Sequence, residues 1–383
     1  MVEGKATLVV DFGNSETRVL TNFGKYADGS TRYALHSLDN HFGPLEYGYR
    51  VSEEYNASNS RIFKMSGGSL CVGDLCRREF INSDDFRPSA IEKKYNSDVT
   101  KMSMINAFLQ GYLDISGMTN VPVDDIDVSW DVVVLLPPAD AEVGSSKLVE
   151  LIRSIEDIEF IMPEVKKDIN ILNISVLLEG FSAYLGTLYD MNRKLRPDFS
   201  YLKKDTTIIV DVGAGTTDIL VVEKGKPIKN TRYTMTIGGN NVHQKVRNAL
   251  NAKGYTYPES FVRESVEVGY IKDGSKTMSI ANEIASAKNT VSRSIVSNIR
   301  DFFEAVEYPV RTIGNILVCG GGAVDADIEG VKPLSYYIVQ YMKGLSENIS
   351  VVELPNITVD GELQKISPRL LNILGAGVAS LRG

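Results

Sequence analysis

Two aspartates and a run of glycines lie together in Asp211-Val212-Gly213-Ala214-Gly215-Thr216-Thr217-Asp218, between the apolar stretches 207–210 and 219–222. An apolar stretch, a glycine-rich turn and a second apolar stretch predict a β-hairpin. Glycine accepts positive φ angles, so successive backbone N–H groups of the turn can face outward and bind phosphate. Asp211, at the end of the first strand, can hold a metal ion through water. Taken alone, the pattern fits a plain hairpin turn with a polar tip equally well.

The same pattern occurs near the N-terminus, in Asp11-Phe12-Gly13-Asn14-Ser15-Glu16-Thr17-Arg18. The two copies lie 200 positions apart and share six identical pairs: Thr7/Thr207, Val10/Val210, Asp11/Asp211, Gly13/Gly213, Thr17/Thr217 and Leu20/Leu220. This separation is far longer than the period of a repeat array. We therefore expect two similar domains that face each other. Their two hairpins would hold the phosphates of a nucleoside triphosphate in the cleft between them.

Three successive glycines, Gly320, Gly321 and Gly322, follow the apolar stretch 313–319. A strand that runs into three glycines allows a flat ligand to approach the backbone closely, because no side chain stands in the way. A nucleotide base or ribose fits that description. A tight strand-to-helix turn is the alternative interpretation, but such a turn rarely needs three glycines.

The composition is that of an ordinary globular chain of two or three domains, with 383 residues, 43% hydrophobic and 23% charged. No apolar stretch is long enough to cross a membrane, and the N-terminus is unlike a signal peptide. The net charge of −8 argues against a broad surface for nucleic acid. Cys71, Cys76, Cys319 and three scattered histidines offer no disulfide framework or zinc site. We expect half-buried structural thiols and a cytoplasmic location.

Hydrophobic periodicity predicts the elements that must hold these residues in place. Segment 24–90 indicates short strands and long loops, and the charged segment 190–205 indicates a crossing between domains. Asp98 can cap one predicted helix, and Asn240 or Asn241 another. Beyond the hairpins, we expect strands at 127–136, 169–178, 229–236 and 313–319, helices at 98–113, 144–156, 181–188, 242–252, 280–305 and 370–381, and a helix followed by a loop at 258–275.

The order of these motifs resembles that of the actin superfamily, which includes actins, heat-shock chaperones of the seventy-kilodalton class, and sugar and acetate kinases. Its five nucleotide-site motifs are similar, in order, to hairpin 11–17, Glu179, hairpin 211–218, glycines 320–322 and the small-residue helix near 375–379.

Within the superfamily, the chain is most similar to the plasmid-segregation actins of the ParM class. Segment 178–183 (Leu-Glu-Gly-Phe-Ser-Ala) resembles the connecting motif of bacterial actins, and segment 72–75 resembles part of the first-domain insertion of ParM-like proteins. The sequence also ends soon after the small-residue helix, where a heat-shock chaperone would continue into a peptide-binding domain.

This resemblance implies an α/β fold of the actin-like, ribonuclease H-like type. Two similar domains, each a mixed sheet flanked by helices, would enclose a nucleotide cleft. Domain I would span 1–190, with an insertion at about 24–95 and the C-terminal helix 367–383 packed back on it. Domain II would span 191–366.

The resemblance also implies roles for individual residues. Asp11 and Asp211 would hold Mg²⁺ through water and take part in catalysis with Glu179, which would orient or activate the attacking water. A glutamate of the 258–269 helix, Glu267 or Glu264, would reach the ribose or base, although the spacing there does not match cleanly. The other nucleotide-binding residues would be Gly13, Asn14, Ser15, Gly213, Ala214, Gly215 and Thr216 at the phosphates, and Gly320, Gly321 and Gly322 at the adenosine.

The implied function is a Mg²⁺-dependent ATPase, using ATP or GTP, that self-associates into filaments and moves plasmid or phage DNA. It would reach its cargo through a DNA-binding adaptor protein on a centromere-like site, without contacting a membrane. Asn14 and Glu16 make the first hairpin poorer in glycine and threonine than in chaperones, so its phosphate contacts would differ.

Two other functions remain open. A small-molecule kinase would use the same clamp, but the sequence shows no second polar cluster for an acceptor. A non-hydrolysing scaffold is the other, and the intact Asp11, Glu179 and Asp211 argue against it.

Overall fold

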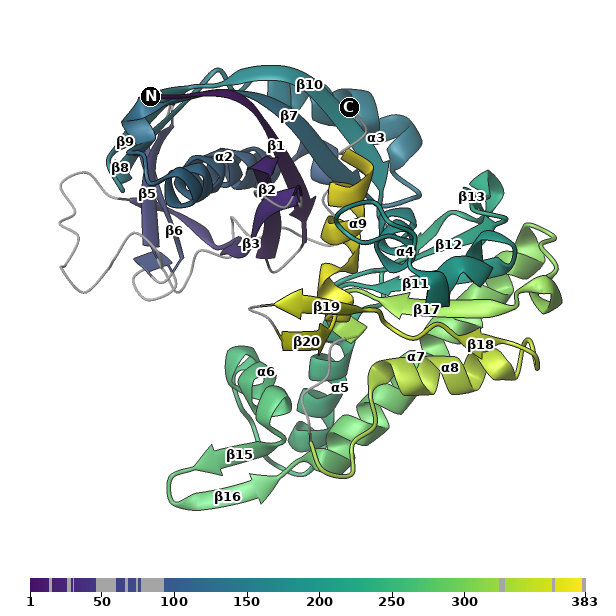
Figure 1. Ribbon diagram of the computed structural model, residues 1–383. Helices are drawn as coiled ribbons and strands as arrows, with labels where there is room; N and C mark the ends of the chain where they lie inside the picture. Colours follow the sequence, from purple (N-terminus) through teal and green to yellow (C-terminus); the bar gives the residue numbers. More distant parts are fainter. Residues whose placement is uncertain are drawn as a thin grey trace.

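The computed structural model describes residues 1–13, 16–25, 29, 31–45, 60–65, 68–73, 75–76, 93–323, 328–359 and 362–380. In this part of the chain, three larger β-sheets are joined by helices that pack between them and around them (Figure 1). None of the helices described is long and apolar enough to span a membrane.

The first sheet contains both strands of the N-terminal hairpin. Its strands run in the order β10-β7-β1-β2-β3, where β1 (Val2–Phe12) is antiparallel to β2 (Glu16–Lys25) and parallel to β7 (Ile126–Leu136). Strand β10 (Asn170–Leu178) is parallel to β7, and β3 (Thr31–Asp39) is antiparallel to β2. The carboxyl ends of β1, β7 and β10 therefore meet at one edge, beside the first hairpin turn.

A second sheet belongs to the same half of the chain and has the order β4-β6-β5-β8-β9. Its strands are β4 (Phe42–Leu45), β6 (Gly68–Gly73), β5 (Ser60–Met65), β8 (Asp157–Met162) and β9 (Val165–Asp168). Within the expected insertion at 24–95, strands β4, β5 and β6 lie in this second sheet. Strand β3 belongs to the first sheet, and the hairpin β8–β9, which our sequence analysis missed, completes the second.

Helix α2 (Asp98–Thr119) lies between these two sheets (Figure 1). Fifteen of its 22 residues are buried, so it lacks the polar face that sets a helical period. This explains why the sequence predicted its end at 113, six residues too early. The expected cap at Asp98 was also wrong, because the Ser97 Oγ accepts the hydrogen bond from Val99 N at 3.2 Å.

The third sheet carries the second hairpin, with the order β13-β12-β11-β17-β18. Strand β11 (Thr206–Val212) is antiparallel to β12 (Thr217–Glu223) and parallel to β17 (Asn315–Cys319), as β1 is to β2 and β7. The edges are short: β13 (Lys226–Pro227), β18 (Ser350–Val351) and β14 (Tyr233–Met235), which pairs with β12. Of the strand expected at 229–236, only the three residues of β14 form.

One face of this third sheet is covered by α5 (Gly239–Ala252), α7 (Ala281–Ala305) and α8 (Leu334–Lys343), which share its apolar core. Gly238, rather than an asparagine, is the N-cap of α5, and Asn241 Oδ1 accepts a hydrogen bond from Gly238 N at 2.8 Å. The loop expected after α6 (Glu259–Val268) is a hairpin of β15 (Tyr270–Asp273) and β16 (Lys276–Ser279), which projects from the molecule (Figure 1).

Two helices form the seam between the first and third sheets, α4 (Phe181–Leu188) and α9 (Leu371–Ser380). A Cβ on Gly375 would lie 1.7 Å from Ser182 O, and one on Gly186 would lie 2.7 Å from Leu371 O. Glycine is therefore required on both helices, because their backbones are in contact. Val9 of β1 and Ile209 of β11 belong to the same buried cluster, so the seam packs against both sheets.

The remaining regular elements are short or lie at the edges of the three sheets. Helix α3 (Ala141–Arg153) packs beside the first sheet and begins three residues earlier than expected. Cys71 and Cys76 are fully buried rather than half-buried. The other elements are the hairpin of β19 (Asn356–Val359) and β20 (Glu362–Lys365) and the 3₁₀ turns η2 (Lys94–Asn96), η3 (Val123–Asp125), η4 (Pro197–Lys203), η5 (Lys229–Thr231), η6 (Val310–Thr312), η7 (Gly321–Ala323) and η8 (Pro368–Leu370).

Candidate functional site

The two predicted hairpins form, and matching hydrogen bonds close their turns. Gly13 N donates a hydrogen bond to Glu16 O at 3.0 Å, and Gly213 N donates one to Thr216 O at 2.8 Å. A Cβ on Gly13 would lie 2.6 Å from Glu16 O, so the first turn excludes any larger residue. Each turn is closed by the residue three positions after its first glycine, as the sequence repeat predicts.

Both turns face a single cavity of about 590 Å³. Gly215 and Glu264, which we expected at the nucleotide, do not line it, and Asn14 and Ser15 lie outside the described residues. The predicted residues that do line it are Asp11, Gly13, Glu179, Asp211, Gly213, Ala214, Thr216, Glu267, Gly320, Gly321 and Gly322. Residues separated by more than 300 positions are thus brought to one place.

Four buried carboxylates lie at the centre of the cavity: Asp11, Glu179, Asp211 and Asp218, with exposures of 3 to 6%. Burial, and then the neighbouring acids, raise the pKa of Glu179 to about 8 despite the opposing effect of Lys94. Burial also raises the pKa of Asp218 to about 7. Among cations, Arg18 forms an ion pair with Asp11 and Lys94 forms one with Glu179.

This excess of buried negative charge fits a divalent cation. In the residues that the structure describes, no three His, Cys, Asp or Glu side chains converge to bind a metal directly. The arrangement therefore suits an ion held through water and the oxygens of a ligand, as is usual for Mg²⁺.

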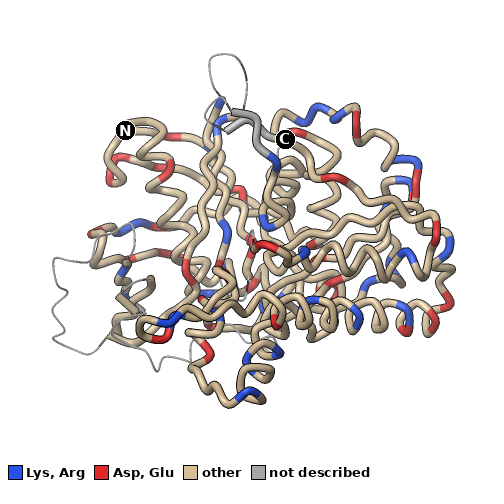
Figure 2. Tube along the Cα trace, turned by 90° about the horizontal axis from the view of Figure 1, so that it is seen from below, with Lys and Arg blue, Asp and Glu red and all other residues tan. Residues whose placement is uncertain are grey.

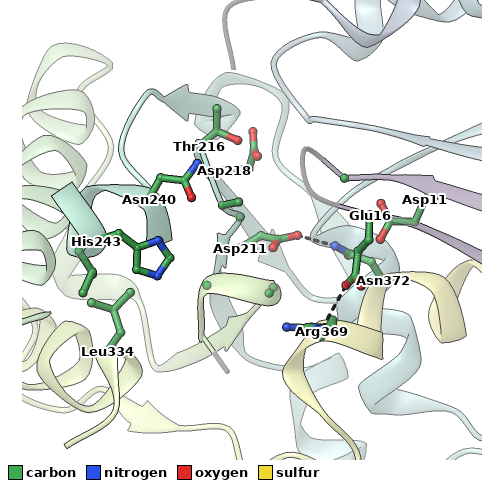
Figure 3. Close-up of a pocket in the computed structure, with 18 of the residues that line it drawn as sticks. Asp11, Glu16, Asp211, Thr216, Asp218, Asn240, His243, Leu334, Arg369 and Asn372 are labelled. Carbon is green, nitrogen blue, oxygen red and sulfur yellow. Dashed lines mark hydrogen bonds and ion pairs between the residues drawn. The ribbon is translucent and has the colours of Figure 1, made fainter. Parts of the chain in front are cut away.

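The first hairpin balances its acids with arginine. Arg18 Nη1 lies 2.9 Å from Asp11 Oδ2, and Arg18 Nη2 lies 2.9 Å from Glu16 Oε1. Arg369, just before α9, adds a longer ion pair of 3.3 Å to the same Glu16 oxygen (Figure 3). Burial opposes the charge of Arg18, yet Asp11 and Glu16 together raise its pKa.

The second hairpin pairs its acids with neutral groups instead. Asp211 Oδ2 accepts a hydrogen bond from Asn372 Nδ2 at 2.5 Å (Figure 3), and Asp218 Oδ1 accepts one from Thr234 Oγ1 at 2.5 Å. Asn372 Oδ1 in turn accepts from Gly180 N at 2.9 Å. One asparagine of the seam helix α9 thus connects Asp211 with the residue that follows Glu179.

The three glycines after β17 have a packing role that the sequence did not reveal. A Cβ on Gly320 would lie 2.3 Å from Asp211 Oδ1 and 2.4 Å from Val212 O, and its φ of +92° is itself unfavourable for other residues. A Cβ on Gly322 would lie 2.7 Å from Gly213 O. These glycines let the chain pass against the end of β11, and they also leave the cavity wall free of side chains.

The far end of the cavity is formed by polar residues of three helices. His243 of α5, Arg263 and Glu267 of α6 and Lys288 of α7 line it, and of these our sequence analysis named Glu267 alone. Burial, and then Arg263, lower the pKa of His243 to about 4, so this imidazole is neutral at ordinary pH. Nothing in their spacing marked these residues, because each lies on a helix whose period is set by its apolar face.

By sequence, known proteins match only part of this chain, whereas solved structures align with nearly all of it. Residues 209–327 match the model for the C-terminal part of archaeal MreB-like actin homologues. The actin-like protein MamK of Paramagnetospirillum magneticum is 23% identical over 49% of this chain and 58% of its own length. MamK of Magnetospirillum gryphiswaldense is 22% identical over 49% and 56%. The chain thus matches less than two thirds of these relatives.

Solved structures align over nearly the whole chain. The actin-like protein Alp7A has a TM-score of 0.68 at 16% identity, covering 98% of this chain and 95% of its own. The archaeal actin homologue Ta0583 has a TM-score of 0.67 at 15% identity, with 100% and 99% covered. A ParM of a 15-stranded filament from Clostridium botulinum has a TM-score of 0.65 at 16% identity, with 99% and 100% covered.

Proposed function

Because this chain has the actin-like fold, we propose that it is an ATPase that binds Mg-ATP between its two hairpins and polymerises with it. One observation carries the proposal. Two hairpin turns closed by matching hydrogen bonds and one buried glutamate, Glu179, face a single cavity with an excess of negative charge. Proteins of the same fold include one solved with ATP and one with ADP, which supports the choice of ligand.

The residues divide the ligand between them. Gly13 N and Gly213 N are used to close the turns. The N–H groups of Ala214 and Thr216 would bind the phosphates in the second turn, with Asn14 and Ser15 proposed to do so in the first. Asp11 and Asp211 would hold Mg²⁺ through water, and the ion would neutralise phosphate charge when bound. Glycines 320–322 and Glu267 would contact the nucleoside.

Glu179 is the proposed general base. It directly follows β10, and Glu179 N donates to Leu136 O at 2.9 Å, so the backbone of this residue is held at the edge of the first sheet. Its carboxylate would accept one proton from a water molecule as the water oxygen attacks the γ-phosphorus in line. The bond from that phosphorus to the β-γ bridging oxygen would break, giving ADP and inorganic phosphate.

Loss of the γ-phosphate would remove a link between the two hairpins. The halves would then rotate about the seam of α4 and α9, where the backbones already touch. If faces of both halves contact the next subunit, this rotation weakens the polymer. Similarity to filament-forming relatives such as the Clostridium botulinum ParM supports this step.

We propose plasmid or phage DNA as the cargo, reached in the cytoplasm through a basic DNA-binding adaptor. The net charge of −8 favours such an intermediary over direct contact with DNA. In the view of Figure 2, Lys and Arg alternate with Asp and Glu along the chain and do not gather on one side. We also propose domain limits near residues 190 and 366, with the C-terminal helix counted in domain I.

The test combines phosphate release with sedimentation of the purified chain in Mg-ATP, Mg-GTP, Mg-ADP and no nucleotide. We expect phosphate release and a pellet with the triphosphate that the protein prefers, and no pellet without nucleotide. Sugars and carboxylic acids are added in a second series. Turnover that these acceptors stimulate, without any pellet, would contradict the filament and indicate a kinase.

A further inference from the structure

Lys94 approaches the proposed general base more closely than any other cation in the described chain. Its Nζ lies 2.6 Å from Glu179 Oε1, and its side chain is only 20% exposed. It also lines the cavity between the two hairpins. No motif in the sequence pointed to this lysine, which lies in the short 3₁₀ turn η2, far from every glycine-rich segment.

The position of Lys94 is fixed by its neighbours in the sequence. Lys93 Nζ forms an ion pair of 2.7 Å with Asp140, the N-cap of α3. The Tyr95 ring packs against Gly144 of α3, where a Cβ would lie 2.2 Å from the ring. Lys94, between these two fixed residues, is therefore held with its side chain at the cavity. Any side chain at position 144 would displace the turn.

The charges around Glu179 show what the ammonium group does. Apart from Lys94, the ionisable groups that act on Glu179 are Asp11 of β1, Asp211 of β11 and Asp218 of β12, and Cys319 of β17 lies nearby. Every one of these is an acid. Lys94, paired with Glu179 at 2.6 Å, thus favours an ionised Glu179. Burial lowers the pKa of Lys94, but Glu179 and Asp11 raise it overall.

We propose that Lys94 is a positioning residue that acts through Glu179, aiming its carboxylate and favouring its ionised form while a polyphosphate binds beside it. The inference rests on the proposed ATPase function. Without this partner the carboxyl group would take up a proton near neutral pH, which disables the base, and in alkali, where it is ionised, it would repel the γ-phosphate. Lys94 therefore serves triphosphate binding and proton transfer together, without contacting phosphate itself.

Nucleotide affinity tests this division without relying on turnover. In Lys94→Met at alkaline pH, where Glu179 is ionised, we expect about tenfold weaker binding of Mg-ATP, with Mg-ADP binding changed less than about twofold, because only the γ-phosphate meets Glu179. Adding Glu179→Gln to Lys94→Met removes the repelling charge, and ATP affinity should return to within about threefold of the wild type. Titration with a fluorescent nucleotide analogue, followed by competition, gives all of these constants.

The pH profile of kcat is the second readout. Since loss of a neighbouring cation raises the pKa of an acid, the lower limb of the profile in Lys94→Met should move up by about one unit or more. The kcat should then be about tenfold lower near neutral pH and approach the wild-type value in alkali. Lys94→Arg should restore the wild-type limb. Lys166→Met, which breaks an exposed 3.7 Å pair with Glu159, is the matched control.

Three results would overturn the inference. Equal weakening of ATP and ADP would mean that Lys94 supports the fold or binds the shared phosphates. Failure of the double variant to recover ATP affinity would mean that Lys94 binds the γ-phosphate directly. An unshifted pH limb would mean that Glu179 does not depend on Lys94. A wild-type protein that binds no nucleotide would instead overturn the proposed function, and this inference with it.

Discussion

The two hairpins at the cavity have the same strand register and differ in charge. In β1–β2, Asp11 lies opposite Arg18, whereas in β11–β12, Asp211 lies opposite Asp218. The hydrogen bond that closes each turn is the same, and the strands pair in the same register around the turns. The first hairpin therefore neutralises its own acid, while the second places two acids side by side with only neutral donors to satisfy them.

This difference shows how one scaffold can take two tasks. The backbone amides of both turns suit phosphate oxygens, so each hairpin can bind the anion. Only the second has surplus negative charge for a cation, and the first instead offers an arginine. We infer that Asp211 contributes more to magnesium binding than Asp11. Glu179 belongs to neither hairpin, and its proposed task is the transfer of a proton.

The largest effect should come from Glu179, which belongs to neither hairpin. Glu179→Gln keeps the shape of the side chain and removes the base, so we expect kcat for phosphate release to fall by about 100-fold or more. Affinity for Mg-ADP should stay within about threefold. If kcat fell by less than about threefold, proton transfer would have to be assigned to another residue.

Removing the arginine of the first hairpin should lower the free energy of unfolding. Arg18→Leu leaves Asp11 and Glu16 without their buried partner, and we expect a loss of about 3–5 kcal/mol in the free energy of unfolding. Asp218→Asn removes a surplus acid from the matching position and should cost no more than about 1 kcal/mol. Urea unfolding of both variants measures this asymmetry, and equal losses would contradict it.

Asp218 of the second hairpin, together with Glu179, should make the free energy of unfolding depend on pH. Burial raises the pKa of Asp218 to about 7 and that of Glu179 to about 8, so the folded state holds protons that the unfolded state has released. This contribution is complete below about pH 4 and is lost as the pH rises through about 7 to 8. Without nucleotide, the melting temperature should fall between about pH 6 and about pH 9.

Variants measured over the same pH range separate the contribution of Asp218 from that of an exposed ion pair. Asp218→Asn should flatten the decline, and added Mg²⁺ should reduce it, because the ion replaces the lost protons. Glu142→Gln, at an exposed ion pair with Lys229, should leave the slope unchanged. A wild-type melting temperature that rises over this pH range would show that the acids are not protonated in the folded chain.

The smallest effect concerns the outer end of the first hairpin. Arg369 is 42% exposed and its pair with Glu16 is 3.3 Å long, so Arg369→Ala should change stability by less than about 1 kcal/mol. Calorimetric melting of this variant beside Arg18→Leu compares the exposed arginine with the buried one. A loss as large as that of Arg18→Leu would mean that both arginines hold the turn.

The sequence predicted the hairpins because strand alternation and identical residues at a fixed distance are local signals. It also contained the Arg18 and Asp218 difference, but the meaning of that difference depends on cross-strand register, which residue types alone do not specify. Lys94 could not be predicted, since its importance arises from the packing of Tyr95 on Gly144. The hairpin β8–β9 could have been found from the alternation of Ile158 and Phe160.

Helix α2 shows a different limit of sequence reasoning. A helix enclosed by two sheets has no exposed face, so the periodicity that marks surface helices disappears and its end was misplaced. The sequence marked the three glycines after β17 as a place where a ligand could approach the backbone closely. Their close approach to Asp211 and Gly213 emerged only from the packing of the chain against β11.

The most direct test of the account is the lifetime of the polymer after a single addition of Mg-ATP, followed by light scattering and sedimentation in the wild type and in Glu179→Ala. The account predicts that the wild type assembles and then disassembles as phosphate is released, while Glu179→Ala assembles and persists. Polymers of equal lifetime in the two proteins, or ATP consumption with no polymer at any protein concentration, would contradict it.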